Sequence, residues 1–238
     1  MLSSYLPSSQ KRLSCHQELL LLIWRLCDSN KKFLHHILKT SEMLDLIVPI
    51  LHYLNEARED PCRLGLVHIS VFLLLLLSGE RNFGVRLNAP WQSKAALDVP
   101  SFNGSHGDLL IIVFHKLITS GHARISSLYD CLLTIIVNIS PYLKKLTMVT
   151  GKLKSNASHE DKKSSAVNSN WKFYIFLRGV KLYYGLHIFL ATKILHLIEA
   201  FCQPTFLFAQ QQNHHLIFFL LETVNNLVQV NPNHLKQK

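Results

Sequence analysis

The sequence predicts an all-α fold of stacked helical hairpins, of the armadillo or HEAT type. Apolar residues recur at helical spacing along most of the 238 residues, in segments separated mostly by short turns. No segment shows the sustained apolar–polar alternation of a strand, and no Asn-Gly or Asp-Gly pair joins two apolar runs. About eight or nine helices are expected, and this number alone favours a repeat architecture, because no sequence period of about 40 residues is visible.

The segment from Asp60 to Pro90 is the one around which the predicted core is organised. Asp60 precedes a proline, a pair that favours a helix start because the carboxylate accepts from a free N–H and proline lacks one. From Leu66 to Leu77 all residues but two are apolar, and Gly79 follows where a left-handed C-cap would end the helix. These twelve residues are fewer than the about 20 that a bilayer requires. We therefore expect the most buried helix of the domain, with three solvent-free leucines: Leu73, Leu74 and Leu76.

Three helices are expected before this segment, after a flexible lead-in at residues 1–14. The first ends before an Asp-Ser-Asn turn, and the second has its apolar residues on one face and its lysines and histidines on the other. The third can be capped by Ser41 and contains Pro49, which should kink or divide it. Their expected bounds are Gln17–Cys27, Lys31–Lys39, and Ser41 to about Ala57.

The chain after Pro90 is expected to form a connecting loop and then five more helices. The loop, Asn88–Gly107, is long for a compact domain, which makes it a candidate for partner contact. Two of the helices should carry a single polar stripe each. The stripes are Asp130, Thr134 and Asn138, and then Glu222, Asn225, Asn226 and Gln229. The expected helices are Asp108–Ser120, Ser126–Ile139, Ser140 to about Val149, Thr192 to about Phe201, and about Asn213 to Gln229.

Composition and charge limit the classes of function. Hydrophobic residues form 48% of the chain and charged residues only 17%, which suggests that further chain covers some apolar faces. The net charge of +10 raises nucleic acid or an anionic membrane as partners, but the basic residues form no stripe with interleaved aromatic residues. We therefore expect no nucleic acid partner. The five cysteines have unrelated spacings and are expected to be reduced and mostly buried.

The loop after the central helix holds the candidate site residues. Arg81 and Arg86 could grip a phosphate or a partner carboxylate, but pairing with Glu80 or with helix C-terminal carbonyls is the favoured interpretation. Together with Asn82 and Phe83 they form a candidate interaction or structural loop. The sequence contains no P-loop and no recognisable nucleophile signature, so we predict no catalytic or cofactor-binding residue and no enzyme activity.

Histidines near acidic residues invite a metal interpretation in two places. The two groups are His196 with Glu199, and His214 and His215 with Glu222. Two ligands are a weak signal without a third, so surface or core histidines are favoured and no metal is predicted. His115 is expected to act as a cation near the C-terminus of its helix, where the helix dipole favours positive charge.

No membrane-spanning helix and no signal peptide are expected. Leu66–Leu77 and Leu109–Ile118 are too short to span, and Phe173–Leu190 contains an arginine and a lysine. Residues 1–14 contain a proline and several serines instead of an apolar segment. Any membrane contact is therefore expected to be peripheral.

The segment LVHISVFLLLLLSGERNFGVRLN, residues 66–88, resembles the Hid family, which is named for high-temperature-induced dauer formation. The resemblance covers most of residues 5–229, with one gap. It is supported by HQELL (16–20), NKKFL (30–34), DLLI (108–111), FHK (114–116), DCLLT (130–134), SPYLK (140–144), KILHL (193–197) and QNHHL (212–216).

This resemblance implies a function without identifying any chemistry. It implies a cytosolic scaffold, peripherally associated with Golgi and trans-Golgi membranes, that acts in trans-Golgi sorting and secretory-granule (dense-core vesicle) biogenesis. Such a scaffold would bind proteins of the Golgi and vesicle trafficking machinery. The alternative is a helical domain that binds an anionic lipid or membrane surface through its basic residues.

Residues 151–190 depart from the family pattern, which by resemblance runs directly from Thr150 to Ala191. The 40 extra residues begin with a polar half typical of disordered chain and end with an aromatic-rich half. We hypothesise a retained intron that stays in frame, and we expect this insertion to be unstructured or poorly packed. The predicted division is a lead-in (1–14), a helical-repeat core (15–150), the insertion (151–190), a continuation of the repeat (191–230) and a tail (231–238).

Overall fold

The computed structural model describes residues 15–40, 43–91, 104–120, 122–143 and 188–229. Within these residues the chain is helical, and the only β contact is an isolated antiparallel bridge between Pro90 and Ser105. This confirms the predicted all-α class. The expectations for the lead-in, for residues 92–103 of the connecting loop, for the helix expected to continue past residue 143, for the insertion up to residue 187 and for the C-terminal tail lie outside the described residues. Residues 188–190, which were expected to belong to an unstructured insertion, are helical, so α9 begins four residues before the expected Thr192.

The helices are numbered along the chain, with η marking short 3-10 turns. The first part of the chain forms α1 (His16–Ser29), α2 (Lys31–Lys39), α3 (Met43–Ala57), η1 (Pro61–Arg63), α4 (Leu64–Ser78) and α5 (Arg81–Arg86). The second part forms α6 (His106–Ser120), η2 (His122–Leu128), α7 (Tyr129–Ile139), η3 (Ser140–Tyr142), α9 (Ile188–Phe201), α10 (Pro204–Leu207) and α11 (Asn213–Gln229).

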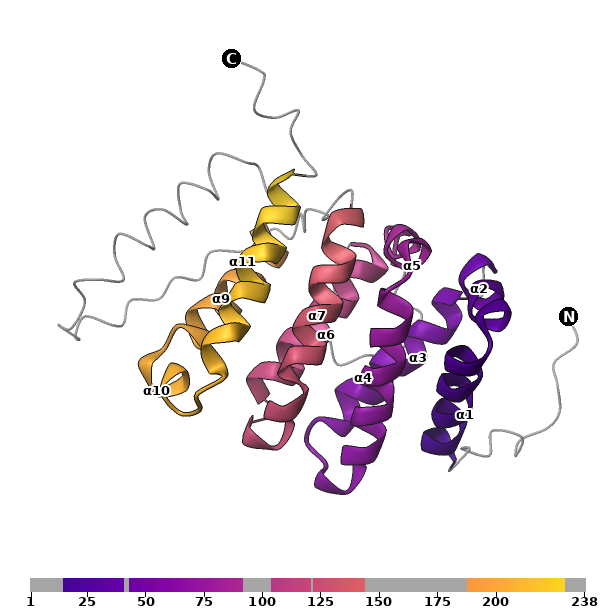
Figure 1. Cartoon of the computed structure of the whole chain (residues 1–238), viewed down its shortest axis with the longest axis horizontal. Helices are drawn as coiled ribbons and strands as arrows, with labels where there is room; N and C mark the ends of the chain where they lie inside the picture. Colours follow the sequence, from indigo (N-terminus) through magenta and orange to yellow (C-terminus); the bar gives the residue numbers. More distant parts are fainter. Residues whose placement is uncertain (1–14, 41–42, 92–103, 121, 144–187, 230–238) are drawn as a thin grey trace, which may run out of the picture.

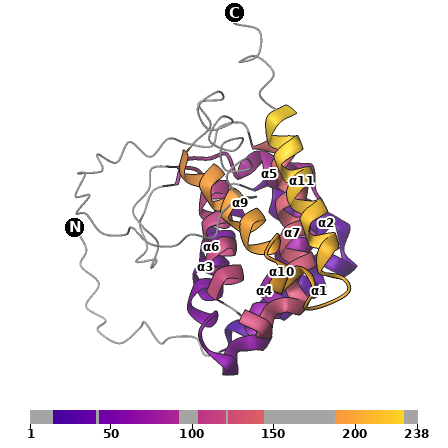
Figure 2. The ribbon, with the colours of Figure 1, turned by 90° about the vertical axis from the view of Figure 1, so that its left-hand side faces the viewer.

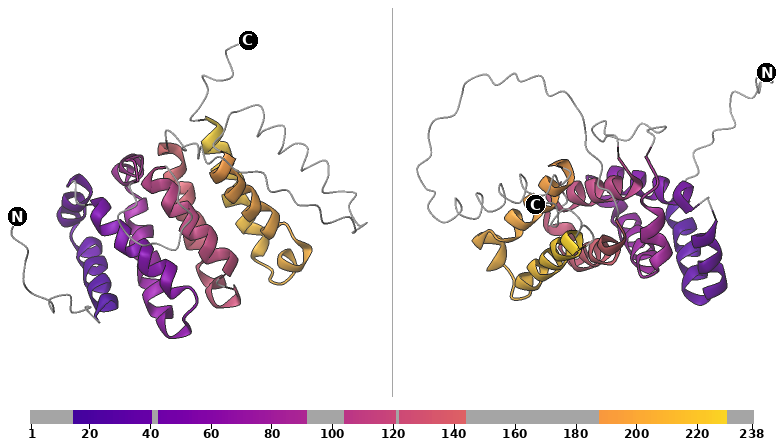
Figure 3. Two further views of the ribbon diagram at one scale, coloured as in Figure 1. Left: turned by 180° about the vertical axis from the view of Figure 1, so that it is seen from behind. Right: turned by 90° about the horizontal axis from the view of Figure 1, so that it is seen from above.

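The long helices form two layers (Figures 1 and 2). Layer one contains α1, α4, α7 and α11, each in contact with the next, and layer two contains α3, α6 and α9 in the same order. Contacts between α3 and α4, α6 and α7, and α9 and α11 join the layers. Seen from above, the successive pairs stack side by side along the long axis (Figure 3). The predicted stack of helical hairpins is therefore confirmed.

Polar caps fix where several helices begin. The Asn30 side chain accepts from the backbone N–H groups of Lys32 and Phe33 at the start of α2. The Asp60 carboxylate accepts from an N–H of η1, as its position before proline predicted. α6 begins at His106, two residues earlier than expected, because Ser105 and Asp108 accept from each other's backbone N–H groups.

The core differs in one respect from the prediction. Leu73 and Leu74 of α4 are solvent-free, as expected, but Leu76 is only half-buried. Nine of the fifteen residues of α4 are buried, against eleven of the fifteen in α6. The most buried of the described helices is therefore α6, which lies between α3 and α9 and also contacts α7, whereas α4 exposes Phe72.

The chain between α4 and α6 corrects two further expectations. Gly79 has φ −64° and ψ −15°, a right-handed conformation, so it is no left-handed cap. The chain turns instead at Glu80, whose backbone is extended, and then forms α5 where a loop was expected. Pro49 does not divide α3, which is continuous from Met43 to Ala57.

Two helical segments in the described residues pass a length and hydropathy test for membrane spans. They are Pro61–Ser78, with mean hydropathy 1.9, and Arg124–Tyr142, with mean hydropathy 1.2. The first corrects our length argument, because η1 extends the apolar helix to 18 residues. Half of each segment is buried inside the protein, and α4 is covered by α1, α3 and α7. Both segments have the character of core helices.

Two matching asparagine–serine contacts hold layer one in register. Asn138 on α7 donates to the hydroxyl of Ser78, the last residue of α4, at 3.1 Å. Asn226 on α11 donates to the hydroxyl of Ser140, just past α7, at 3.0 Å. Each serine hydroxyl in turn donates to the carbonyl three residues earlier, at 2.8 Å. The same joint thus links α4 to α7 and α7 to α11, before and after the predicted insertion.

The cysteines are free, but their burial was predicted wrongly. All five lie in the described residues, and none forms a disulfide. Only Cys27 is buried, whereas Cys15, Cys62 and Cys202 are exposed.

Candidate interaction surface

Arg86 joins α5 to the end of α2. Its guanidinium donates to the backbone carbonyls of Lys39 and Thr40, the last residue of α2 and its C-cap. Carbonyls at a helix end lack a partner within their own helix, so a cation there satisfies them and favours the dipole. Arg86 therefore contacts helix-terminal carbonyls, although they belong to α2 and not to α4.

Phe83 and Gly84 fix the other side of α5. Phe83 is fully buried. A Cβ added at Gly84 would lie 2.7 Å from Cδ2 of Tyr142, so only glycine lets α5 approach η3 this closely. The Asn88 side chain donates to the Tyr142 carbonyl at 2.8 Å and strengthens the same contact. Two of the four predicted site residues, Phe83 and Arg86, are thus built into a structural joint.

Arg81 and Asn82 are different, because both are exposed. Neither side chain has a hydrogen bond or ion pair with any residue in the described ranges. The expectation that Arg81 would contact a carbonyl or an acidic side chain is therefore wrong within those ranges. A role for the two residues in binding a partner stays a prediction.

In the described structure, the large apolar side chains that are exposed lie on a few elements of the fold. They lie on layer-one helices α1, α4 and α11, on α5, and in the turn after α10, whereas the described side chains of α3, α6 and α9 contribute none. A concentration of exposed apolar groups on one face is typical of an interaction surface. The residues are Leu19, Leu21, Leu22, Leu26, Phe72, Val85, Phe208, Phe218 and Leu221.

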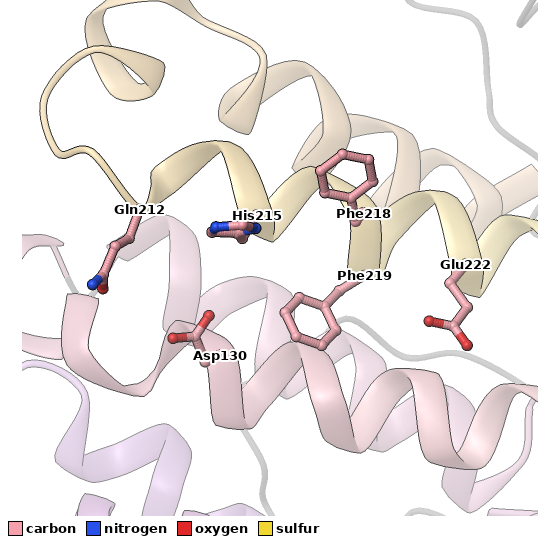
Figure 4. A pocket seen from close by; sticks show the side chains of 6 residues that line it. All are labelled: Asp130, Gln212, His215, Phe218, Phe219 and Glu222. Atoms are coloured by element: carbon pink, nitrogen blue, oxygen red, sulfur yellow. The ribbon is translucent and has the colours of Figure 1, made fainter.

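A groove of about 440 Å³ lies between the layer-one helices α7 and α11. Asp130 contributes a carboxylate from the first turn of α7, and the remaining lining residues come from α11 and the residue before it. Figure 4 shows Asp130 and Phe219 between the two helices, with Glu222 further along α11. Phe218 lies at the groove edge with 64% of its surface exposed. The lining residues are Asp130, Gln212, His215, Phe218, Phe219 and Glu222.

The side chains that line this α7–α11 groove are suited to binding a ligand. Its two phenyl rings can bury apolar side chains of a ligand, and its two carboxylates can pair with cations. An apolar wall with a few polar groups is the usual composition of a binding site.

A contact between a buried and an exposed histidine links α6 to α9 in layer two. Nε2 of His115 lies 2.9 Å from Nδ1 of His196, so one ring nitrogen donates and the other accepts. His115 is almost fully buried, and its Nδ1 has no hydrogen-bond partner within the described residues. Burial, followed by the charge of Lys193 and by His196, lowers the pKa of His115 from its ordinary value of 6.5 to about 4. The expectation of a cationic His115 stabilising a helix dipole is therefore wrong, since its ring is neutral at pH 7.

The histidines that invited a metal interpretation are not gathered into a metal site in the described structure. No group of three or more His, Cys, Asp and Glu side chains there could hold a metal ion. His215 and Glu222 both line the α7–α11 groove, and His214 stacks near His215 with ring centroids 4.0 Å apart. His196 instead contacts His115.

Sequence reasoning missed the groove because it assigned these residues to other roles. Asp130 was assigned to a polar stripe, and His215 and Glu222 to a weak metal pattern. One signal was available in the sequence. Phe218 and Leu221 lie outside the apolar stripe of α11 that faces the core, and large apolar residues on the polar face of an amphipathic helix do not contribute to its packing against that core. That α7 supplies the opposite wall could not be foreseen, because Asp130 and Glu222 are far apart in sequence.

The comparisons with known proteins agree on one family. A family model described as "High-temperature-induced dauer-formation protein" matches residues 1–236. Protein HID1 of Mus musculus and Protein HID1 of Homo sapiens are each 52% identical over 229 residues, which is 96% of this chain and 24% of each relative. The Ubp5-interacting protein ftp105 of Schizosaccharomyces pombe is 24% identical over 242 residues, covering 98% of this chain and 22% of that protein. No solved structure matches the chain.

The chain thus spans about a quarter of the length of these relatives. The family match extends from residue 1 to residue 236, a range that includes the helices of both layers. The stacked α-helical chain belongs to the Hid1 family, the high-temperature-induced dauer-formation proteins.

Proposed function

We propose that this chain is a non-enzymatic helical scaffold that acts by protein–protein binding in trans-Golgi sorting and secretory-granule (dense-core vesicle) biogenesis. The scaffold works in the cytoplasm and is peripherally associated with Golgi and trans-Golgi membranes. The exposure of large apolar side chains on the layer-one helices α1, α4 and α11 supports the proposal. The compartment and the pathway are those that the resemblance to the Hid family implies.

Protein binding suits this surface better than catalysis does. Helical stacks present extended faces made of successive helices, and such faces commonly bind other proteins. Layer one combines exposed aliphatic groups on α1 with exposed aromatic groups near α11, which is the composition of a contact surface. The name of the Schizosaccharomyces pombe relative describes it as Ubp5-interacting, which supports partner binding as a property of the family.

An anionic lipid surface is the alternative partner. The α7–α11 groove weighs against it, because exposed Asp130 and Glu222 would repel anionic head groups beside the exposed Phe218. Co-sedimentation with anionic and neutral liposomes at several salt concentrations separates the two classes. The scaffold proposal predicts no pelleting with either, whereas salt-sensitive pelleting with anionic liposomes alone would favour the alternative.

Proximity labelling in secretory cells tests the function directly. The chain is fused to a biotin ligase and compared with the same ligase expressed alone in the cytosol. We expect enrichment of trans-Golgi and immature-granule proteins, and loss of that enrichment in a Phe218→Ser/Leu221→Ser variant. Both side chains are more than half exposed, so the variant should keep its unfolding temperature. A labelling pattern equal to that of the free ligase would overturn the proposed function.

A further inference from the structure

The α7–α11 groove is acidic although the protein is basic. Its two carboxylates, Asp130 and Glu222, are both exposed, and neither forms an ion pair with a cation in the described part of the chain. The remaining polar groups that line the groove are the Gln212 amide and the His215 ring (Figure 4). The full chain has a net charge of +10, so this local excess of negative charge runs against the average.

The groove also has an apolar wall of a definite shape. Phe219 is partly buried between α7 and α11, and Phe218 stands one position earlier with most of its ring in solvent. Leu221 lies one turn further along α11 and is 51% exposed. A ligand can therefore bury apolar side chains along the first half of α11 while its charged groups reach the two carboxylates.

From this combination we propose that the groove binds a cationic amphipathic helix of a partner protein, with aliphatic side chains against Phe218 and Phe219 and Lys or Arg paired with Asp130 and Glu222. A helix is the fitting shape because the groove runs between two adjacent helices and an amphipathic helix inserts an apolar face into such a groove. The inference rests on the proposed scaffold function and names the chemistry of its partner.

Charge decides against the other ligand classes. Anionic lipid head groups, phosphorylated peptides and acidic helices would all bring negative charge to Asp130 and Glu222. Like charges in a contact are unfavourable and serve to reject wrong partners. A neutral amphipathic helix would gain the apolar contacts. It would also displace water from the two carboxylates without giving them a charged partner.

Peptide binding to the full 238-residue chain tests the proposal. The probe is a fluorescent helical peptide of about 14 residues, or roughly four turns, with leucines on one face and lysines beside them. Matched peptides carry Glu in place of every Lys, or Ser in place of every Leu. We expect the Glu peptide to bind at least about tenfold more weakly in fluorescence anisotropy, and Phe218→Ser to weaken binding of the Lys peptide similarly.

Charge variants of the protein locate the effect. Asp130→Asn/Glu222→Gln should bring the Lys and Glu peptides within about twofold of each other. The control, Asp45→Asn/Glu18→Gln, removes the same charge from exposed residues of α3 and α1 and should leave the preference unchanged.

Two results would overturn the inference: equal binding of the Lys and Glu peptides, or a Lys preference that survives Asp130→Asn/Glu222→Gln. Either result would leave the scaffold proposal standing if Phe218→Ser/Leu221→Ser still abolished proximity labelling. If that labelling matched the free ligase instead, the proposed function would fail together with its partner chemistry.

Discussion

The α6–α7 pair meets the α9–α11 pair at two junctions, and the two are built in opposite ways. In layer two the junction is closed by buried side chains: His115 is almost fully buried where it meets the exposed His196, and the adjoining Leu197 is solvent-free. In layer one Asn226 and Ser140 join α11 to the end of α7, but a groove lined by the exposed Phe218 and the partly buried Phe219 opens further along. The two pairs of helices thus pack together in both layers, and the groove lies on the layer-one side alone among the described residues.

This difference separates stability from recognition. A buried contact contributes to the free energy of unfolding because its groups leave water on folding. An exposed apolar side chain contributes little to that free energy and remains available to a partner. Layer two should therefore tolerate substitution poorly, and the outer face of layer one should tolerate it well while losing binding.

Replacing a leucine on each side of the junction should give the largest contrast. Leu197→Ala on α9 removes a fully buried side chain and should lower the free energy of unfolding by about 2–5 kcal/mol. Leu221→Ala on α11 makes the same chemical change at a half-exposed position and should cost less than about 1 kcal/mol. Urea unfolding of both variants measures the difference. Equal losses would contradict the assignment of stability to layer two.

The histidine contact should make the closed junction sensitive to acid. The pKa of His115 in the folded protein is lowered from 6.5 to about 4. Between pH 6.5 and pH 4, His115 is therefore protonated in the unfolded chain but neutral in the folded one. The free energy of unfolding is therefore unaffected by this group above about pH 6.5, and it decreases by up to about 3 kcal/mol as the pH drops toward 4. His115→Gln keeps a polar, non-titrating group there and should flatten this part of the stability–pH curve. Parallel curves for the variant and the unchanged protein would show that His115 titrates normally.

The asparagine joint of layer one should contribute less. Asn226→Ala removes the donor to Ser140 and leaves a buried hydroxyl with one partner fewer, so the free energy of unfolding should fall by about 1 kcal/mol. Asn138→Ala breaks the equivalent contact to Ser78 and should have a similar effect. Asn225→Ala, next to Asn226 but exposed, serves as the control and should stay within about 0.5 kcal/mol. Thermal unfolding of the three variants checks the order.

Local patterns predicted most of the helices but not how they meet. α2 has the expected bounds, Lys31–Lys39, because an asparagine cap and a clear apolar face define it within nine residues. α11 was also placed correctly, from Asn213 to Gln229. The start of α6 was missed by two residues, since the capping pair of Ser105 and Asp108 was not recognised. Signals within one turn of a helix were therefore readable from the sequence.

Contacts between distant segments were not readable in this way. His115 and His196 are 81 residues apart, and nothing in either segment shows that their rings meet. The conformation of Gly79 was predicted wrongly because glycine permits a left-handed cap without requiring one. The groove needed α7 and α11 to be adjacent, which follows from the stacking of whole helical pairs.

The central claim is that the outer face of layer one is the protein-contacting side. Photo-crosslinking in secretory cells tests it most directly, with photoreactive benzoylphenylalanine in place of Phe218 at the groove or in place of Asp45, which is exposed on α3 in layer two. We predict discrete protein adducts from position 218 that disappear in the Asp130→Asn/Glu222→Gln background, and none from position 45. Equal adducts from both positions, or adducts from position 45 alone, would contradict the division of the fold into a stabilising layer and a binding layer.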